Sequence, residues 1–97
     1  MIDFSTALRL AEEELAKISK RMLLEDKLVI DNALTMEREF GWVFFYNSEA
    51  YLLRKEEERR LLGNAPILVD KLSGSLIFLG TAKPVDEYIQ DYLIKKE

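Results

Sequence analysis

Apolar residues recur every three or four positions near both ends of the chain, which is the spacing of the buried face of an amphipathic helix. The first stripe consists of Phe4, Ala7, Leu8, Ala11, Leu15, Ile18 and Met22. The second stripe consists of Val85, Tyr88, Ile89, Tyr92 and Leu93. The pattern therefore predicts an N-terminal helix that fades near Leu24 and a C-terminal helix from Asp86 to Ile94. Asp3 or Ser5 can cap the first helix by accepting backbone N–H groups.

Four shorter apolar runs between these helices are typical of β-strands. They are Leu28–Met36, Gly41–Tyr46, Ile67–Asp70 and Ser75–Leu79. The connections carry turn residues: residues 25–27 and 63–66 have the composition of turns, and Gly74 suits a left-handed backbone before the last strand. Asp70 stands just ahead of that turn, where its carboxylate is expected to accept backbone N–H bonds.

The run Gly41–Tyr46 gives the strongest strand prediction because it is aromatic and β-branched. Alternation of side chains along a strand gives two faces, Trp42, Phe44 and Tyr46 on one and Val43 and Phe45 on the other. Since both faces are apolar, we expect this strand to be central and covered on both sides at least in part. The run Leu28–Met36 precedes it and is expected to pair with it as a hairpin.

The segment between the second and third strands is the most charged part of the chain. Its composition favours a short helix near Glu49–Leu53 with Ser48 as its cap. A mobile or frayed helical stretch is expected to follow it through the charged run Arg54–Arg60 and to stop at Gly63. A run of this kind is usually a solvated surface.

The order of these elements is helix, two strands, a charged segment with a short helix, two strands, helix. Ninety-seven residues without a linker or repeat make one domain over residues 1–97. We therefore predict an α+β fold, order α-β-β-(α)-β-β-α, in which a four-stranded antiparallel sheet carries an N-terminal and a C-terminal helix. The apolar edge run Ser75–Leu79 could pair with a second copy or be buried, so the oligomeric state stays open.

Composition removes most catalytic chemistries. The chain has no cysteine and no histidine, so a Cys or His nucleophile–base pair and a zinc site with these ligands are impossible within it. The acidic runs at residues 12–14 and 56–58 are consecutive in sequence and would fan out around a helix instead of converging on a substrate. No glycine-rich phosphate loop is present. We therefore expect neither an enzyme nor a bound cofactor or metal.

The net charge and the hydropathy of the chain disfavour two classes of partner, nucleic acids and membranes. The net charge of −4 and the pI near 4.9 disfavour nucleic acid, whose phosphates require basic surfaces. No apolar run approaches the roughly 20 residues that cross a bilayer. The N-terminal residues also lack the pattern of a secretory signal, so a cytoplasmic protein without membrane contact is expected.

Three blocks of the sequence resemble one bacterial family. They read GWVFFYNSEAYL (residues 41–52), GNAPILVDKLSG (residues 63–74) and GTAKPVDEYIQDY (residues 80–92). Their order and spacing are similar to those of the immunity protein 35 or YrhB-like family. This resemblance implies an α+β fold and the role of an immunity protein of a polymorphic toxin system, which binds a cognate toxin domain and occludes its active site. The alternative that it implies is a small, heat-stable, YrhB-like chaperone that binds unfolded proteins.

Both roles require a protein-binding surface, and aromatic and arginine side chains are the residues most often found at the centre of such surfaces. The candidate contacts are Trp42, Tyr46, Tyr51, Arg54, Arg59, Arg60 and Asp70. For the aromatic residues the competing interpretation is a place in the core. The glycines and prolines of the three blocks are more naturally read as requirements of turns than as contacts with a toxin.

Overall fold

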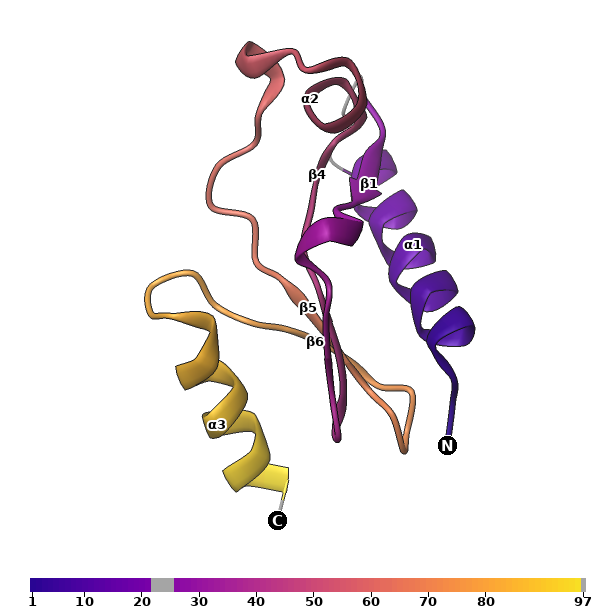
Figure 1. Ribbon diagram of the computed structural model, residues 1–97, viewed down its shortest axis with the longest axis vertical. Coiled ribbons are helices and arrows are strands. Elements are labelled where there is room, and N and C mark those ends of the chain that lie inside the picture. The colour runs from indigo at the N-terminus through magenta and orange to yellow at the C-terminus, as the bar shows by residue number, and fades with distance from the viewer. Residues whose placement is uncertain (22–25, 97) are drawn as a thin grey trace.

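Two antiparallel β-sheets lie between two helices that pack on opposite sides of the β-structure (Figure 1). The computed structural model describes residues 1–21 and 26–96. The two helices are α1 (Phe4–Arg21) and α3 (Val85–Lys96). Both were predicted, and α3 extends slightly beyond the predicted bounds. Met22 and Leu24, at the predicted end of the first helix, and Glu25, at the start of the predicted turn, lie outside the described residues.

The strands form two antiparallel sheets. The larger sheet has the order β2-β3-β5-β6 and consists of β2 (Met36–Arg38), β3 (Gly41–Phe44), β5 (Ile67–Asp70) and β6 (Leu76–Phe78). The smaller sheet consists of β1 (Leu28–Ile30) and β4 (Tyr46–Ser48). The predicted α+β class and the central position of the aromatic strand are confirmed.

The division into two sheets corrects the predicted strands. The expected strand Leu28–Met36 is interrupted by a 3-10 turn, η1 (Asn32–Leu34), because the Asp31 side chain accepts the Ala33 N–H and starts the turn. On the partner strand, Phe45 separates β3 from β4. The Asp31 N–H donates to the Phe45 carbonyl at 2.8 Å, so the hairpin is continuous but bent at this point.

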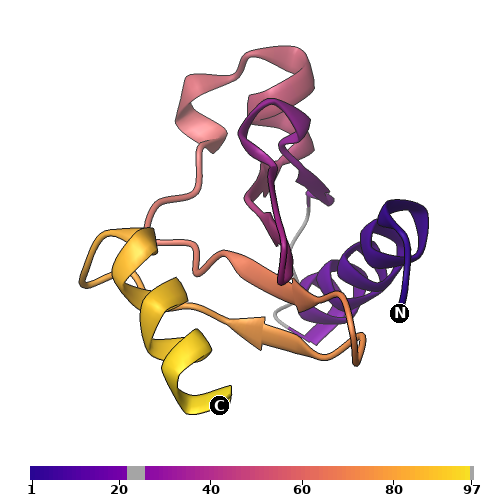
Figure 2. The same cartoon turned by 60° about the horizontal axis from the view of Figure 1, so that its bottom comes forward.

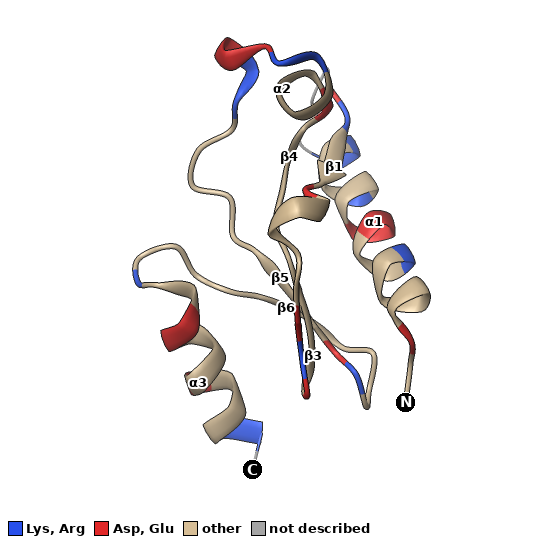
Figure 3. Ribbon diagram, in the orientation of Figure 1, with Lys and Arg blue, Asp and Glu red and all other residues tan. Residues whose placement is uncertain are grey.

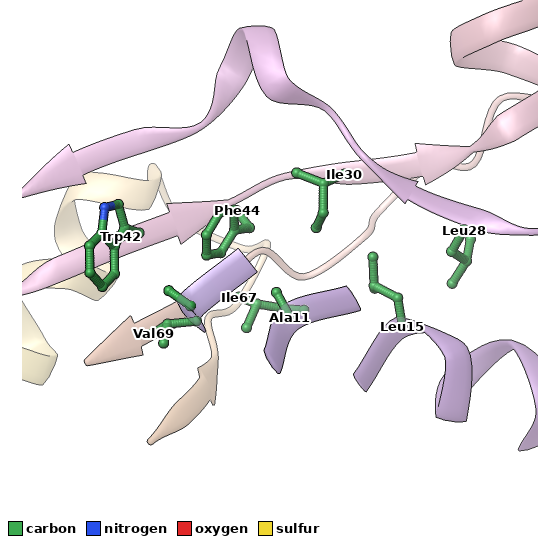
Figure 4. Packing of buried hydrophobic residues seen from close by; sticks show 9 residues of the cluster. Ala11, Leu15, Leu28, Ile30, Trp42, Phe44, Ile67 and Val69 are labelled. Carbon is green, nitrogen blue, oxygen red and sulfur yellow. The ribbon is translucent and has the colours of Figure 1, made fainter. Parts of the chain in front are cut away.

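The helix α1 covers one face of both sheets. Asp3 caps its start, with Oδ1 accepting the Thr6 N–H at 2.9 Å. Its small residues Ala7 and Ala11 are fully buried and allow a close approach to the strands. The core on this side contains Ala11, Leu15, Leu28, Ile30, Trp42, Phe44, Ile67 and Val69 (Figure 4). This core extends from the larger sheet to the smaller one, so α1 joins them.

The opposite face of the larger sheet carries α3, as Figures 1 and 2 show. Its Ile89 is buried against the side chains of Val43 and Leu68. Tyr88 and Tyr92 pack beside this core, as their shared helical face predicted. Val43 and Trp42 therefore face different helices, which confirms the alternation read from the sequence.

Two glycines meet backbone requirements that other residues could not. Gly41 has φ of 145°, and a Cβ placed there would lie 2.0 Å from the Val69 carbonyl oxygen on the neighbouring strand. Gly74 has φ of 74° in the turn before β6, as predicted. These two glycines belong to the sequence blocks at residues 41–52 and 63–74, and they allow the strand pairing and the turn geometry observed there.

The charged segment contains one short helix, α2 (Glu49–Arg54), and one 3-10 turn, η2 (Glu57–Arg59). Ser48 caps α2, since its Oγ accepts the Tyr51 N–H at 3.1 Å. The predicted frayed helix up to Gly63 is not present, because Lys55 adopts a left-handed conformation and ends α2. Among the described residues, no helix is both long and apolar enough to cross a membrane.

Candidate functional site

Three of the seven candidate residues meet in one groove between β4, α2 and residues 60–66. It has a volume of about 260 Å³. Residues that line it include Leu34, Tyr46, Tyr51, Arg60, Leu62 and Asn64. We call it the β4–α2 groove. It lies in the half of the molecule that contains the smaller sheet.

The groove exists because residues 59–64 run beside β4 without joining its sheet. The Asn47 side chain makes two bonds to Leu61, donating Nδ2 to the Leu61 carbonyl at 3.1 Å and accepting the Leu61 N–H at 2.8 Å. Ser48 Oγ donates to the Arg59 carbonyl, and Asn64 Nδ2 donates to the Tyr46 carbonyl. Side chains, and not a backbone ladder, therefore hold the two segments side by side.

The groove offers an aromatic, cationic and apolar surface. The Arg60 guanidinium lies over the Tyr51 ring, 5.6 Å from its centroid, in a cation–π arrangement. Tyr46 is partly buried, and this burial raises the pKa of its hydroxyl. Leu34 and Leu62 form an apolar rim, with 55% and 80% of their surfaces exposed. Tyrosine and arginine are two of the residue types that are enriched at protein-binding hot spots.

Arg54 and Arg59 lie outside the groove. Arg54, at the end of α2, donates Nε to Glu56 Oε2 at 2.8 Å and lies within 4 Å of carboxylate oxygens of Glu49 and Asp26. Arg59 ends η2, and its carbonyl holds Ser48. Figure 3 shows these opposite charges gathered around α2 and η2. Arg54 therefore forms ion pairs within the protein, and Arg59 contributes its main-chain carbonyl to the contact with Ser48.

Trp42 and Asp70, the other two candidates, are buried, with exposed fractions of 2% and 1%. The Trp42 ring packs against Phe4 in the core beneath α1, and the Lys71 ammonium lies 5.3 Å from its centroid. The core interpretation of this aromatic residue is the correct one. Neither side chain is available to a partner in this structure, because the two helices and the sheet enclose them.

Asp70 instead anchors the C-terminal helix to the sheet. Its carboxylate accepts the Leu72 and Ser73 N–H groups, as predicted for the turn, and also the Lys96 ammonium at 2.7 Å and the Tyr92 hydroxyl. Burial alone would raise the pKa of Asp70, but these hydrogen bonds outweigh it and hold the pKa well below its usual range. Burial and the bond to Asp70 raise the pKa of Tyr92 to about 12.

The contacts of Lys96 and the roles of Asn47 and Asn64 were missed from the sequence. Lys96 lies 26 positions from Asp70, and no local spacing connects them. The composition of residues 63–66 assigns Asn64 only to a turn. Asn47 and Asn64 flank the charged run. Two side-chain amides in such positions can form hydrogen bonds that connect the segments before and after the run. Among residues 1–21 and 26–96, no three acidic side chains converge as a metal site.

Comparison with known proteins identifies relatives of the chain. The family described as immunity protein 35 matches residues 5–91. An uncharacterized protein of Escherichia coli (strain K12), YrhB, is 52% identical over 56 residues. That match covers 58% of this chain and 60% of YrhB, so the chain spans about 60% of the length of this curated relative. No solved structure matches the chain.

Proposed function

Because the chain belongs to the immunity protein 35 family, we propose that it binds a cognate toxin domain in the cytoplasm and neutralises it by covering its active site. The observation that carries this proposal is the family match over residues 5–91. The absence of cysteine and histidine from the sequence agrees with a binding protein that performs no chemistry of its own.

We propose the β4–α2 groove as the contact surface. Tyr51 and Arg60 are its anchors, because both present large side chains whose geometry is already set by their mutual stacking. An ordered anchor loses less conformational entropy when it binds, which favours affinity. Leu34 and Leu62 then exclude water around the anchors, in the manner of residues that surround hot spots.

The charges of the protein indicate what kind of partner surface it would attract. The turn η2, which lies beside α2, carries Glu57 and Glu58, and both are exposed. With a net charge of −4, the protein would attract a basic toxin surface and accelerate its association. The net charge therefore favours a toxin domain that is basic overall, whereas the cationic Arg60 in the groove itself would face an acidic or aromatic group.

The test begins with a pulldown from the native bacterium, with the intact protein as bait and a salt wash. A single dominant partner with a toxin-like C-terminal domain is expected. Its isolated domain is then titrated against the protein by calorimetry, and its toxicity is measured in cells with and without the protein. A broad set of weakly bound, heat-enriched clients would instead indicate the chaperone role.

The groove is tested with Tyr51→Ala and Arg60→Ala. Each is expected to raise the Kd at least roughly tenfold, the loss expected when a hot-spot side chain is truncated. Glu87→Ala is the matched control, since Glu87 is exposed on α3, which packs against the larger sheet. If both groove variants bind and protect as the original protein does, the groove is not the toxin-binding surface.

A further inference from the structure

The larger sheet has two edge strands, and they differ in charge. The edge strand β2 carries Glu37 and Arg38, both exposed. Such charges are a common device against strand-to-strand association. The other edge strand, β6, consists of Leu76, Ile77 and Phe78 and has no such protection. Figure 2 shows β6 at the outer side of β5.

The sequence on both sides of β6 is uncharged as well. No charged residue occurs between Lys71 and Lys83, the longest uncharged interval in a chain that is 33% charged. Phe78 keeps 43% of its surface exposed. An uncharged, apolar edge of this kind would be an aggregation hazard if it had no partner.

The hydrogen bonds to β5 show which backbone groups of β6 point outward. Ser75 accepts the Asp70 N–H, and Leu79 donates to the Pro66 carbonyl. Since backbone groups alternate in direction along a strand, Ser75, Ile77 and Leu79 point toward β5, whereas Leu76 and Phe78 point away from it. Within the described residues, the outward N–H groups of Leu76 and Phe78 have no hydrogen-bond partner.

We infer that β6 pairs with the β6 strand of a second copy of this chain, antiparallel and about a two-fold axis at Ile77. This register sets Leu76 opposite Phe78 of the second copy, and these are the two residues whose backbone groups point outward. Each strand thus receives a complementary set of donors and acceptors. A two-fold arrangement needs a self-complementary surface, and an uncharged strand meets this condition without like-charge contacts.

The side chains agree with this register on both faces. Leu76 packs with the core beneath α1, and Phe78 has the same orientation by alternation. Pairing would place each exposed Phe78 beside Leu76 of the second copy and cover it. Ile77, which packs with the core beneath α3, would meet its own copy on the other face. The two larger sheets would become one eight-stranded sheet, and the β4–α2 groove has no residue on β6.

The test is sedimentation velocity of the intact protein over a range of concentrations. The N–H that Phe78→Pro removes points away from β5, a position where an edge strand tolerates proline, and the substitution also removes the exposed ring. We expect it to weaken the dimer at least roughly tenfold, because two intermolecular hydrogen bonds are lost. Glu37→Pro, on the other edge strand, is the matched control and should leave the dimer unchanged. The Lys71 N–H donates to the Phe40 carbonyl, so alternation directs the backbone groups of Trp42 toward β5. Glu37 lies opposite Trp42 on β2, and its N–H therefore points away from the larger sheet.

A second variant, Phe78→Glu, keeps the backbone intact and places two like charges near the axis, so it decides the matter if the proline variant does not fold. Amide exchange at Phe78 should also slow as the concentration rises, whereas exchange at Ile77 should not depend on it. A protein that stays monomeric at every concentration, or a dimer that both Phe78 variants leave unchanged, would overturn the inference. Neither result bears on toxin binding, which is measured with a different partner.

Discussion

The half of the molecule built on the larger sheet and the half built on the smaller sheet are stabilised in different ways. Around β3 and β5, backbone ladders and two helices enclose side chains such as Phe44 and Leu68, which are completely buried. Around β4, side-chain amides hold the irregular residues 59–64 in place, and exposed ion pairs lie around α2. The larger sheet thus forms a densely packed platform, and the smaller sheet carries the proposed contact surface.

The largest effect should come from the platform. Gly41→Ala is expected to lower the free energy of unfolding by more than about 3 kcal/mol, because a methyl group would collide with the Val69 carbonyl in a conformation that favours glycine. Urea denaturation followed by circular dichroism measures this loss. Gly63→Ala is the control beyond β4: Gly63 also has positive φ, but no atom lies within 4 Å, so about 1 kcal/mol is expected. Equal losses at the two sites would contradict the comparison.

Asp70→Asn should have the next largest effect. It breaks a buried ion pair and is expected to cost about 3 kcal/mol at neutral pH, the lower end for such pairs, since 33% of the Lys96 side chain is exposed. Asp91→Asn removes the carboxylate of an exposed pair with Lys83 and should leave stability nearly unchanged. If the two substitutions have the same effect at neutral pH, Asp70 does not anchor α3.

The same variant has a defined pH dependence. Folding lowers the pKa of Asp70, so the ionised carboxylate adds stability that is complete above its ordinary pKa of about 3.9. This stability is lost as the pH falls from that value through the lowered pKa of the folded state. The difference between the original protein and Asp70→Asn should therefore be constant near neutral pH and shrink in acid. A difference that grows in acid would show that the pKa is raised instead.

The sequence predicted the platform well because its features are local. The helix stripes, the two faces of the strand around Trp42 and the left-handed turn at Gly74 all follow from short spacings, and the structure contains them. The break in the first hairpin was not predicted, because it depends on a side-chain bond of Asp31 that ends a strand whose composition favours continuation. The β-propensity of a segment does not show where a side-chain hydrogen bond to the backbone will replace the hydrogen bonds between strands.

The candidate site was predicted less well than the fold. The structure brings the candidates Tyr46, Tyr51 and Arg60 together in one groove. The sequence could not predict this, because their proximity depends on the path of residues 55–64, which carry no periodic pattern. Trp42 and Asp70 are residue types that suit a binding surface, but the fold encloses both. Burial depends on which helix covers which face, and no spacing within one segment encodes that arrangement.

The bonds of Asn47 test how the recognition half is held. Asn47→Ala should lower the free energy of unfolding by about 1–2 kcal/mol, since two partly buried hydrogen bonds to Leu61 are lost. The larger change should be local: exchange of the Leu61 amide should accelerate, whereas amides of β5 should keep most of their protection. Asn32→Ala is the control, because Asn32 is exposed in η1. Uniform loss of protection across both sheets would mean that the two halves unfold as one unit.

The smallest effect is expected at the charged end of the molecule. Arg54 contacts three carboxylates, and the hydrogen bond to Glu56 with the charges of Asp26 and Glu49 raises its pKa, yet 55% of its side chain remains exposed. Water and salt screen such pairs strongly. Arg54→Ala should therefore lower the melting temperature only slightly at low salt, and the difference should disappear at high salt. A loss as large as that of Asp70→Asn, independent of salt, would show that ion pairs stabilise both halves alike.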